Sequence, residues 1–510
     1  MYLMGAVSQR EMEKIEQECI GMDSFKYAWL FDKRRDARKR GITIEVLIAS
    51  QTLSTSRCAF AVVDTPGHLD YYKNTISGIA LGDCGLLVVP AVWVSQSDEM
   101  AVVRDQLVTA FTFGIRQVIV AVNKMDTVEY AQESFDQVKT EVAAIMKSTG
   151  FVPEKVYLIP VSGWAGDNLI QKSTRMTWFD GPTLIDALDH VVSPRRAAEK
   201  PLRVSLLEAY KISGVGTVAV GRVETGTMKP GTTIAFSPTG SISAVQSIEM
   251  SHQAVTEARP GDNIGFSLAG ISAKELKRGY IASEDLRDPA RQAIEFTAQV
   301  VFAHLDGLLS VGSTIVVHCH TTRVTCRVKS IFAKLDRQTG TVVDGNPKHI
   351  ENGDSCIVVL VPTEPMTVEA FREYPSLGRI LLREENCVTG FGIVKSVKKA
   401  RKATEFTSLL AFSRLSAPLT VGSDINVRCR SVQAVCQVKS IVAKVDGPTE
   451  TVADAQPEFI DTTASFIVVL EPKQPIFLET YQEHHLFGTI FVGGSTDVNS
   501  GFGCVKSVKT

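Results

Sequence analysis

Three short motifs carry the side chains of this sequence whose types and spacing could do chemistry. They are Asp64-Thr-Pro-Gly-His68, Asn123-Lys-Met-Asp126 and Ser162-Gly-Trp164, and each follows a run of apolar residues. Taken singly, each motif could be an ordinary turn or a solvated loop. Their ordered occurrence at the ends of predicted strands favours descent from one nucleotide-binding domain.

The first two motifs hold the groups that a nucleoside triphosphate needs. Asp64 would hold Mg²⁺ through water, and the N–H of Gly67 would meet the γ-phosphate. A carboxylate two residues after a lysine can accept both N1–H and N2–H of guanine, a pattern that adenine does not offer. Asp126 would therefore read the base, while Asn123 and Lys124 shape its pocket.

A parallel sheet is needed to position these motifs. Buried strands alternate with amphipathic helices up to about residue 193, which indicates a mostly parallel α/β sheet covered on both faces. Ligands of such sheets bind at the carboxyl edge, where the motifs are expected to lie. The predicted strands are Cys58–Val63, Gly85–Val92, Gln117–Val122 and Val156–Val161.

After Pro201 the sequence pattern changes to short runs of Val, Ile and Thr separated by Gly, Pro and Asp. This pattern predicts antiparallel β-barrels. An internal repeat begins near Ala293, and its register, from Phe296 to Phe406, indicates a duplicated C-terminal barrel. We therefore expect a nucleotide-binding α/β domain over residues 1–197 and barrels over residues 201–290, 293–400 and 403–510.

Composition excludes a uniformly basic protein. Lys and Arg number 54 against 56 Asp and Glu, so any contact with RNA must be local. The ten cysteines form no CxxC pair, which is typical of reduced thiols in a cytosolic protein. The N-terminus lacks a signal-peptide pattern and no window reaches ~18 apolar residues, so we expect a cytoplasmic protein without a membrane partner.

The sequence resembles the elongation factor 1-alpha family of translational GTPases, eukaryotic or archaeal. Besides the three motifs, Phe25-Lys-Tyr-Ala-Trp29, Arg40-Gly-Ile-Thr-Ile44 and Gly214–Gly226 carry the resemblance, which spans about residues 9–398. It implies a P-loop-type GTP-binding domain followed by β-barrels, with GTP or GDP and Mg²⁺ as cofactors. It also implies delivery of aminoacyl-tRNA to the ribosome with GTP hydrolysis, and a guanine-nucleotide exchange factor as a further partner.

The resemblance also assigns roles to individual residues. Thr43 matches the first-switch threonine, whose hydroxyl ligates Mg²⁺, and His68 matches the residue that positions the attacking water. Ser162, Gly163 and Trp164 match the remaining part of the nucleotide site. The alternatives are a strand threonine with a satisfied hydroxyl for Thr43 and a turn-capping histidine for His68.

Weaker parts of the resemblance concern tRNA. Gly216–Glu224 and Pro260–Asn263 resemble segments that help cradle the aminoacyl end, although both are also ordinary strand and turn sequences. Basic residues of the first C-terminal barrel could meet the tRNA backbone or simply solvate loops. They are Lys329, Lys334, Arg337, Lys395, Lys398, Lys399, Arg401 and Lys402.

The sequence departs from the family at two places. No GxxxxGK[ST] loop, which would wrap the β-phosphate, occurs in it, and we expect a chain truncated before that loop and its central strand. Neighbouring strands would then keep unpaired backbone groups, at ~1–3 kcal/mol each. The second departure is the extra barrel, in which Arg337 and Arg379 become Gly447 and Thr489, and this loss argues against a second contact with the tRNA backbone.

Three functions therefore stay open. The first is a GTPase that delivers aminoacyl-tRNA, and the second is a release- or rescue-factor-type translational GTPase. The third is a pseudo-GTPase that binds tRNA or protein partners through its barrels and holds no nucleotide.

Overall fold

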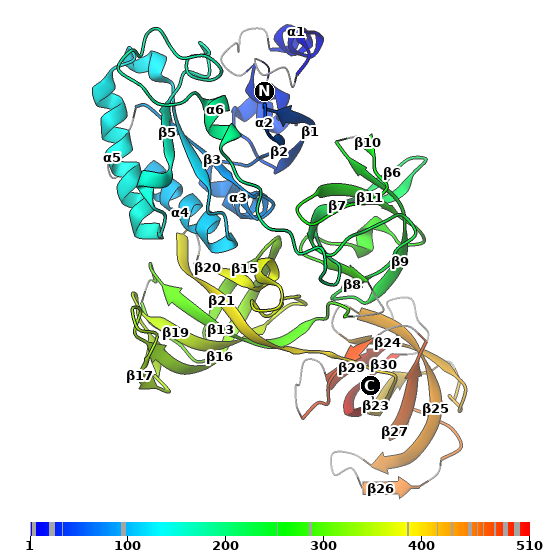
Figure 1. Ribbon diagram of the computed structural model, residues 1–510. Coiled ribbons are helices and arrows are strands. Elements are labelled where there is room, and N and C mark those ends of the chain that lie inside the picture. The colour runs from blue at the N-terminus through cyan, green and yellow to red at the C-terminus, as the bar shows by residue number, and fades with distance from the viewer. Residues whose placement is uncertain are drawn as a thin grey trace.

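The computed structural model describes most of the chain and shows an α/β domain followed by three β-barrels (Figure 1). Phe25 and Gly447, which the sequence singled out, lie outside the described residues. None of the helices within the described part is long and apolar enough to cross a membrane. The described residues are 2, 7–19, 26–32, 34–92, 98–251, 253–284, 288–305, 307–384, 387–415, 417–429, 432–446, 451–455, 457–462, 464–473, 476–482, 488–493 and 500–509.

A three-stranded parallel sheet forms the centre of the α/β domain. Its order is β3 (Gly85–Pro90), β4 (Val118–Asn123) and β5 (Tyr157–Pro160). Alternate residues of β4 point to opposite faces, because side chains along a strand alternate. Val118, Val120 and Val122 pack in the cluster that includes α4 and α5, whereas Ile119 and Ala121 pack in the cluster that includes α6. The helices are α4 (Asp98–Phe113), α5 (Gln132–Thr149) and α6 (Leu184–Asp189).

The strand predicted over residues 58–63 forms, but it lies outside the parallel sheet. It is β2 (Ala59–Asp64), and it pairs antiparallel with β1 (Leu47–Ser54) in a separate two-stranded sheet. A cavity of about 690 Å³ separates β2 from β3. Among the described residues no strand fills this space, so Leu86 and Val88 of β3 are exposed. The remaining helices of this domain are α1 (Gln9–Glu18), α2 (Arg35–Arg40) and α3 (Tyr72–Ile79).

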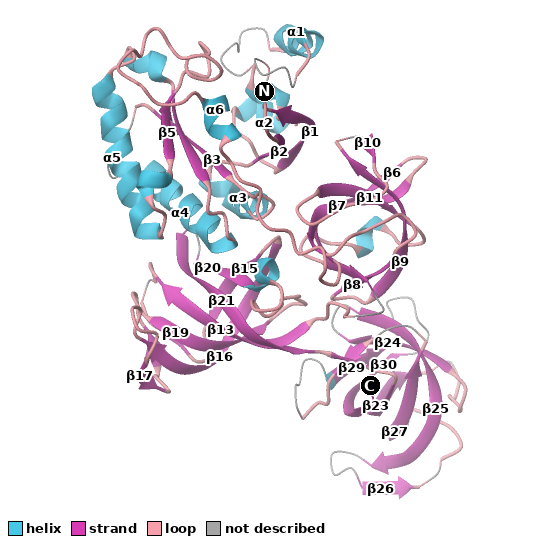
Figure 2. Ribbon diagram, viewed as in Figure 1, coloured by secondary structure: helices cyan, strands magenta, loops and turns pink. Residues whose placement is uncertain are grey.

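The first barrel is a seven-stranded antiparallel sheet closed on itself by pairing of β8 with β9. Strands dominate this and the later parts of the chain (Figure 2). The strands are β6 (Arg203–Ile212), β7 (Gly216–Thr225), β8 (Thr233–Ser237), β9 (Ser241–Met250), β10 (Gln253–Ala254), β11 (Asn263–Leu268) and β12 (Ile281–Glu284).

The second and third barrels have the same strand order, as the sequence repeat predicts. The second is β15-β20-β21-β13-β19-β16-β17, and the third is β24-β29-β30-β23-β27-β25-β26. Each has its own buried apolar cluster. Strands of the second barrel are β13 (Ala293–Phe302), β15 (Thr314–Cys319), β16 (Thr322–Leu335), β17 (Val342–Gly345), β19 (Ser355–Pro362), β20 (Arg379–Glu384) and β21 (Cys387–Lys399). Those of the third are β23 (Glu405–Arg414), β24 (Asp424–Cys429), β25 (Val432–Asp446), β26 (Thr451–Asp454), β27 (Ser465–Pro472), β29 (Thr489–Val492) and β30 (Ser500–Lys509).

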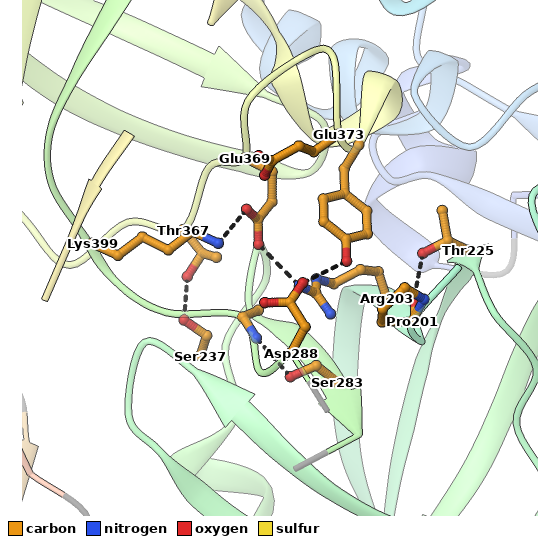
Figure 3. Close-up of polar contacts among 12 residues, drawn as sticks. Pro201, Arg203, Thr225, Ser237, Ser283, Asp288, Thr367, Glu369, Glu373 and Lys399 are labelled. Atoms are coloured by element: carbon orange, nitrogen blue, oxygen red, sulfur yellow. Dashed lines mark hydrogen bonds and ion pairs between the residues drawn. The ribbon is translucent and has the colours of Figure 1, made fainter. Parts of the chain in front are cut away.

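A buried ion network joins the first and second barrels (Figure 3). The guanidinium of Arg203, on β6, lies 2.8 Å from a carboxylate oxygen of Asp288 and 3.3 Å from one of Glu369. Lys399 meets the other oxygen of Glu369 at 2.6 Å, and the hydroxyl of Tyr374 donates to Asp288 at 2.6 Å. Because Arg203 and Glu369 are both fully buried, each charge needs oppositely charged partners within the protein.

Candidate nucleotide site

The loop that follows β4 is fastened to the loop that follows β5 by Asn123. Its side-chain oxygen accepts the backbone N–H of Lys124 at 2.8 Å and that of Gly163 at 2.9 Å. Lys124 has a left-handed backbone with φ of 66°, and Met125 is buried in the domain core. The Asn123 side chain is therefore used to shape the loops, and Lys124 is left exposed at their surface.

Asp126 and Ser162 meet directly at this junction. The buried hydroxyl of Ser162 donates to Oδ1 of Asp126 at 2.5 Å and accepts the N–H of Ala165 at 3.1 Å. One carboxylate oxygen of Asp126 is thus held in place by a buried donor. A fixed, half-buried carboxylate is the acceptor that the N1–H and N2–H groups of guanine require.

Trp164 lies on the outside of this junction, with 55 % of its surface exposed. The ring of Tyr27 meets it edge-on at 6.2 Å between centroids, and the ammonium of Lys26 lies 5.4 Å from its ring. The early segment that carries Lys26 and Tyr27 therefore reaches the base-reading loops. An exposed aromatic ring beside them is suited to pack on the flat face of a base.

A second group of polar side chains lies at the end of β2. The hydroxyl of Thr43 is 3.5 Å from Oδ2 of Asp64, the long end of hydrogen-bond distance. Burial and the nearby charge of Asp32 raise the pKa of Asp64 to about 6, although Thr43 acts in the opposite direction. Two carboxylates and a hydroxyl form a hard-oxygen donor set, and such a set fits Mg²⁺.

Asp32 is the member of this group that sequence reasoning missed. It is buried, its pKa is raised by that burial, and Thr43 and Arg38 oppose the rise. The available signal was an acidic residue directly after the apolar run Trp29–Phe31, within a segment whose other residues match the family.

His68 and Gly67 stand at the exposed start of the segment after β2. The ring Nδ1 of His68 accepts the backbone N–H of Asp70 at 3.2 Å and caps the short helix Leu69–Tyr71. This is the turn-capping alternative considered from the sequence. Gly67 is exposed, and a Cβ atom added there would meet no atom within 4 Å, so the space beside it is open.

The predicted site residues therefore form two groups on separate sheets. Asn123, Asp126 and Ser162 meet at the ends of β4 and β5, whereas Thr43 and Asp64 meet at the end of β2. The cavity between β2 and β3 reaches Asp64, Thr65 and Gly67 but not the base-reading residues. The first group fits guanine and the second fits Mg²⁺, but the sequence has no GxxxxGK[ST] loop to fit the phosphates between them.

The segments expected to hold the aminoacyl end of tRNA are engaged inside the protein. In Gly216–Glu224, the carboxylate of Glu224 lies 2.7 Å from the ring of His320 in the second barrel and accepts the hydroxyl of Ser205 at 2.8 Å. Pro260–Asn263 lies partly along the cavity beside the α/β domain. These contacts link domains and do not by themselves indicate a tRNA site.

Most of the basic residues considered for tRNA also have partners within the barrels. Lys334 meets Asp354 at 2.9 Å, and Arg337 donates to the carbonyl of Phe302 at 2.8 Å. Arg379, whose loss in the repeat was read as loss of a tRNA contact, instead donates to the carbonyl of Thr112 in the α/β domain at 3.2 Å. The half-buried guanidinium of Arg379 therefore packs against α4, and the interpretation of its loss in the repeat stays a prediction.

Family sequence models match nearly the whole chain. The one described as the elongation factor Tu GTP binding domain matches residues 1–194, and elongation factor Tu domain 2 matches residues 216–283. The one described as GTP-eEF1A C-terminal domain-like matches residues 295–395 and again residues 405–506, in agreement with the two repeated barrels.

Individual relatives agree with these matches. The chain is 43 % identical over 406 residues to elongation factor 1-alpha of Entamoeba histolytica, covering 78 % of this chain and 91 % of that protein. It is 44 % identical over 404 residues to elongation factor 1-alpha of Plasmodium falciparum, with the same coverage. The GTP-bound GTPase-like domain of Saccharomyces cerevisiae Ski7 has a similar fold, with a TM-score of 0.63, 15 % identity and coverage of 77 % of this chain and 92 % of that one.

Proposed function

The chain belongs to the elongation factor 1-alpha family of translational GTPases, and we propose that it delivers aminoacyl-tRNA to the ribosomal A site with hydrolysis of GTP. The observation that carries the proposal is the junction of Asn123, Asp126 and Ser162, where a buried hydroxyl orients the carboxylate that would read guanine.

In the proposed site, Asp126 accepts the two N–H groups of guanine while Ser162 holds the carboxylate in place. Lys124 and Trp164 flank the base from the exposed side of the loops. This part of the site selects the nucleotide but takes no part in hydrolysis.

Thr43 and Asp64 would hold Mg²⁺, which when bound neutralises charge on the phosphate oxygens. Asp64 has to lose its proton first, because a protonated carboxyl is a poor ligand, and its raised pKa of about 6 makes this step sensitive to pH. The N–H of Gly67 would donate to the γ-phosphate. His68 would orient the attacking water after it releases the N–H of Asp70.

The affinity of this site rests on its base-reading and metal-binding ends. We expect a dissociation constant on the order of micromolar or tighter.

Protection of the ester bond of aminoacyl-tRNA tests delivery directly. We expect the full chain to slow spontaneous deacylation severalfold with GTP and Mg²⁺, and much less with GDP. Binding of guanine nucleotide without any such protection would contradict delivery and favour a release- or rescue-type role. Protection that is equal with and without nucleotide would favour the pseudo-GTPase. Stimulation of nucleotide release by a guanine-nucleotide exchange factor would extend the proposal to that partner.

A further inference from the structure

One face of the second barrel is covered by helices of the α/β domain. Leu381 and Val388, on β20 and β21, pack with Tyr72 and Ile76 of α3 in a single buried cluster, against which Phe113 of α4 also packs. All four residues of the cluster are less than a tenth exposed. Two helices therefore pack on this face, which includes Leu381 and Val388 and is called the helix seat below.

Polar contacts complete the seat. The guanidinium of Arg383 lies over the ring of Tyr72 at 4.6 Å. Asp105 of α4 accepts the backbone N–H of Val388 at 3.2 Å, and its negative charge is close enough to act on Arg383. The seat thus combines an apolar surface with one cation that faces a carboxylate on the seated helix.

The third barrel carries the same face in the same register. In the second barrel β20 pairs with β21 through Leu381 and Phe391, and in the third β29 pairs with β30 through Phe491 and Phe502. On the neighbouring strand His318 lies opposite Leu381, just as Arg428 lies opposite Phe491. The strand orders are identical, so Phe491, Phe502 and Arg428 take the places of Leu381, Phe391 and His318.

Within the part of the chain that the structure describes, no helix covers the corresponding face of the third barrel. Leu381 has none of its surface exposed, whereas Phe491 is 48 % exposed and Phe502 is 61 % exposed. A shallow groove of about 460 Å³ lies along Arg428, Phe491 and Phe502. Two adjoining exposed phenylalanines are costly in water, and such patches mark interaction sites.

Both barrels carry one cation on this face, but at different positions. Burial lowers the pKa of His318 to about 3, so the second barrel has a neutral ring there and takes its cation from Arg383. In the third barrel Gly493 stands in the position of Arg383, and Arg428 stands in the position of His318. The guanidinium of Arg428 lies 5.7 Å from the ring of Phe491, so one cation borders the aromatic surface again.

We propose that the face formed by Arg428, Phe491 and Phe502 is a docking surface for an amphipathic helix of a partner protein, of the same type as α4. Apolar side chains of that helix pack on the two phenylalanines, and a carboxylate meets Arg428. The homologous seat within this chain holds helices, and this is the reason for choosing a helix.

A second copy of this chain is the less suitable occupant. Its α3 and α4 already pack on its own second barrel, which buries Tyr72 and Ile76. Two third barrels meeting through this face would place the Arg428 guanidinium groups of both copies at one interface, where like charges repel.

The test uses the full chain and a peptide with the sequence of α4, residues 98–113, labelled with fluorescein at its N-terminus and amidated at its C-terminus. Fluorescence anisotropy should show saturable binding, and Phe502→Ser should weaken it at least about tenfold, as expected for an aromatic anchor. Phe459→Ser is the control, because Phe459 is also 48 % exposed on this barrel but does not line the groove. It should leave the affinity unchanged.

A charge reversal makes the test specific. Arg428→Glu should weaken binding of the unmodified α4 peptide. A peptide with Asp105→Lys should regain affinity for the Arg428→Glu variant but should not bind the unmodified chain more tightly. No binding of the α4 peptide, or equal binding to Phe502→Ser and the unmodified chain, would overturn the proposal. A dimer in sedimentation velocity that Phe502→Ser abolishes would also overturn it, in favour of a second copy. None of these measurements requires nucleotide, so their outcome is independent of the proposed GTPase function.

Discussion

The hydroxyl of Ser162 donates to Oδ1 of Asp126 at 2.5 Å, across the junction of two loops that follow neighbouring parallel strands. Ser162 is fully buried, so water does not compete for this bond. Asn123 fastens the same two loops through its bond to the N–H of Gly163. The base-reading end of the site is therefore held in shape by bonds within the protein, before any nucleotide arrives.

Replacement of the base-reading carboxylate should change which base is bound. Asp126→Asn substitutes a donor N–H₂ for one acceptor oxygen, so the side chain no longer matches the N2–H of guanine and matches the C2 carbonyl of xanthine instead. We expect GTP affinity to fall about 100-fold or more while XTP affinity rises, since buried polar mismatches are costly. Competition of GTP and XTP against a fluorescent nucleotide measures both. An unchanged preference for GTP would show that Asp126 does not contact the base.

Removal of the orienting hydroxyl should weaken binding without changing its preference. Ser162→Ala frees Asp126 and leaves the N–H of Ala165 without its acceptor, so we expect a loss of roughly 10-fold in GTP affinity, equivalent to one hydrogen bond to a charged group. Thr140→Ala is the control, since Thr140 bonds only its own exposed helix. The same titration reports both, and equal affinities in the two variants would rule out the positioning role.

The raised pKa of Asp64 predicts how pH affects the α/β domain. Because the folded pKa is about 6 and the unfolded value is about 3.8, the folded protein holds an extra proton between these pH values. Its contribution to the free energy of unfolding therefore falls as pH rises through this window. Asp64→Asn should raise that free energy by roughly 1–3 kcal/mol at pH 8 and change it little at pH 4.

Tryptophan fluorescence can measure this effect in the intact chain, because all four tryptophans lie before residue 194. Denaturation without Mg²⁺ or nucleotide is followed at both pH values. Asp136→Asn, on the exposed face of α5, is the control and should show no difference between them. An equal effect of Asp64→Asn at pH 4 and pH 8 would contradict the raised pKa.

In the buried network between the first two barrels, replacing Arg203 and Glu369 together should cost less stability than replacing Arg203 alone. Arg203→Met leaves the fully buried Glu369 without one of its cations, and we expect a loss of about 3–5 kcal/mol. The double variant Arg203→Met with Glu369→Gln should recover much of this loss. Lys329→Ala breaks an exposed ion pair with Glu295 and should cost less than about 1 kcal/mol.

Denaturation followed by far-ultraviolet circular dichroism, which reports loss of strands as well as helices, provides the comparison. If Arg203→Met costs no more than Lys329→Ala, the network does not hold the two barrels together. A double variant as unstable as the single one would show that Arg203 acts through packing on Tyr374, over whose ring it lies at 4.3 Å, and not through Glu369.

The sequence was most informative where its signals are local. Apolar runs ending in polar motifs predicted the strands that lead to the loops of Asn123 and Ser162, and the repeat from Phe296 to Phe406 predicted a second copy of the same barrel. Family matches over the two repeated regions confirm that duplication.

The sequence failed where the outcome depends on packing between distant segments. The pattern of residues 58–63 predicts a buried strand, but it does not say that β1 would be its partner or that a cavity would separate it from β3. Arg379 appeared in the sequence as a surface cation, because only the folded chain brings α4 against β20. Asp32 carries no motif of its own, and only its proximity to Asp64 makes it notable.

Titration of a fluorescent GTP analogue into the purified full chain with Mg²⁺ measures whether the chain binds guanine nucleotide. We expect saturable binding with a dissociation constant on the order of micromolar or tighter, displaced by GTP and GDP but not by ATP. The result that would contradict it is no detectable binding at millimolar nucleotide, or displacement by ATP and GTP alike, since Asp126 held by Ser162 is arranged to distinguish them.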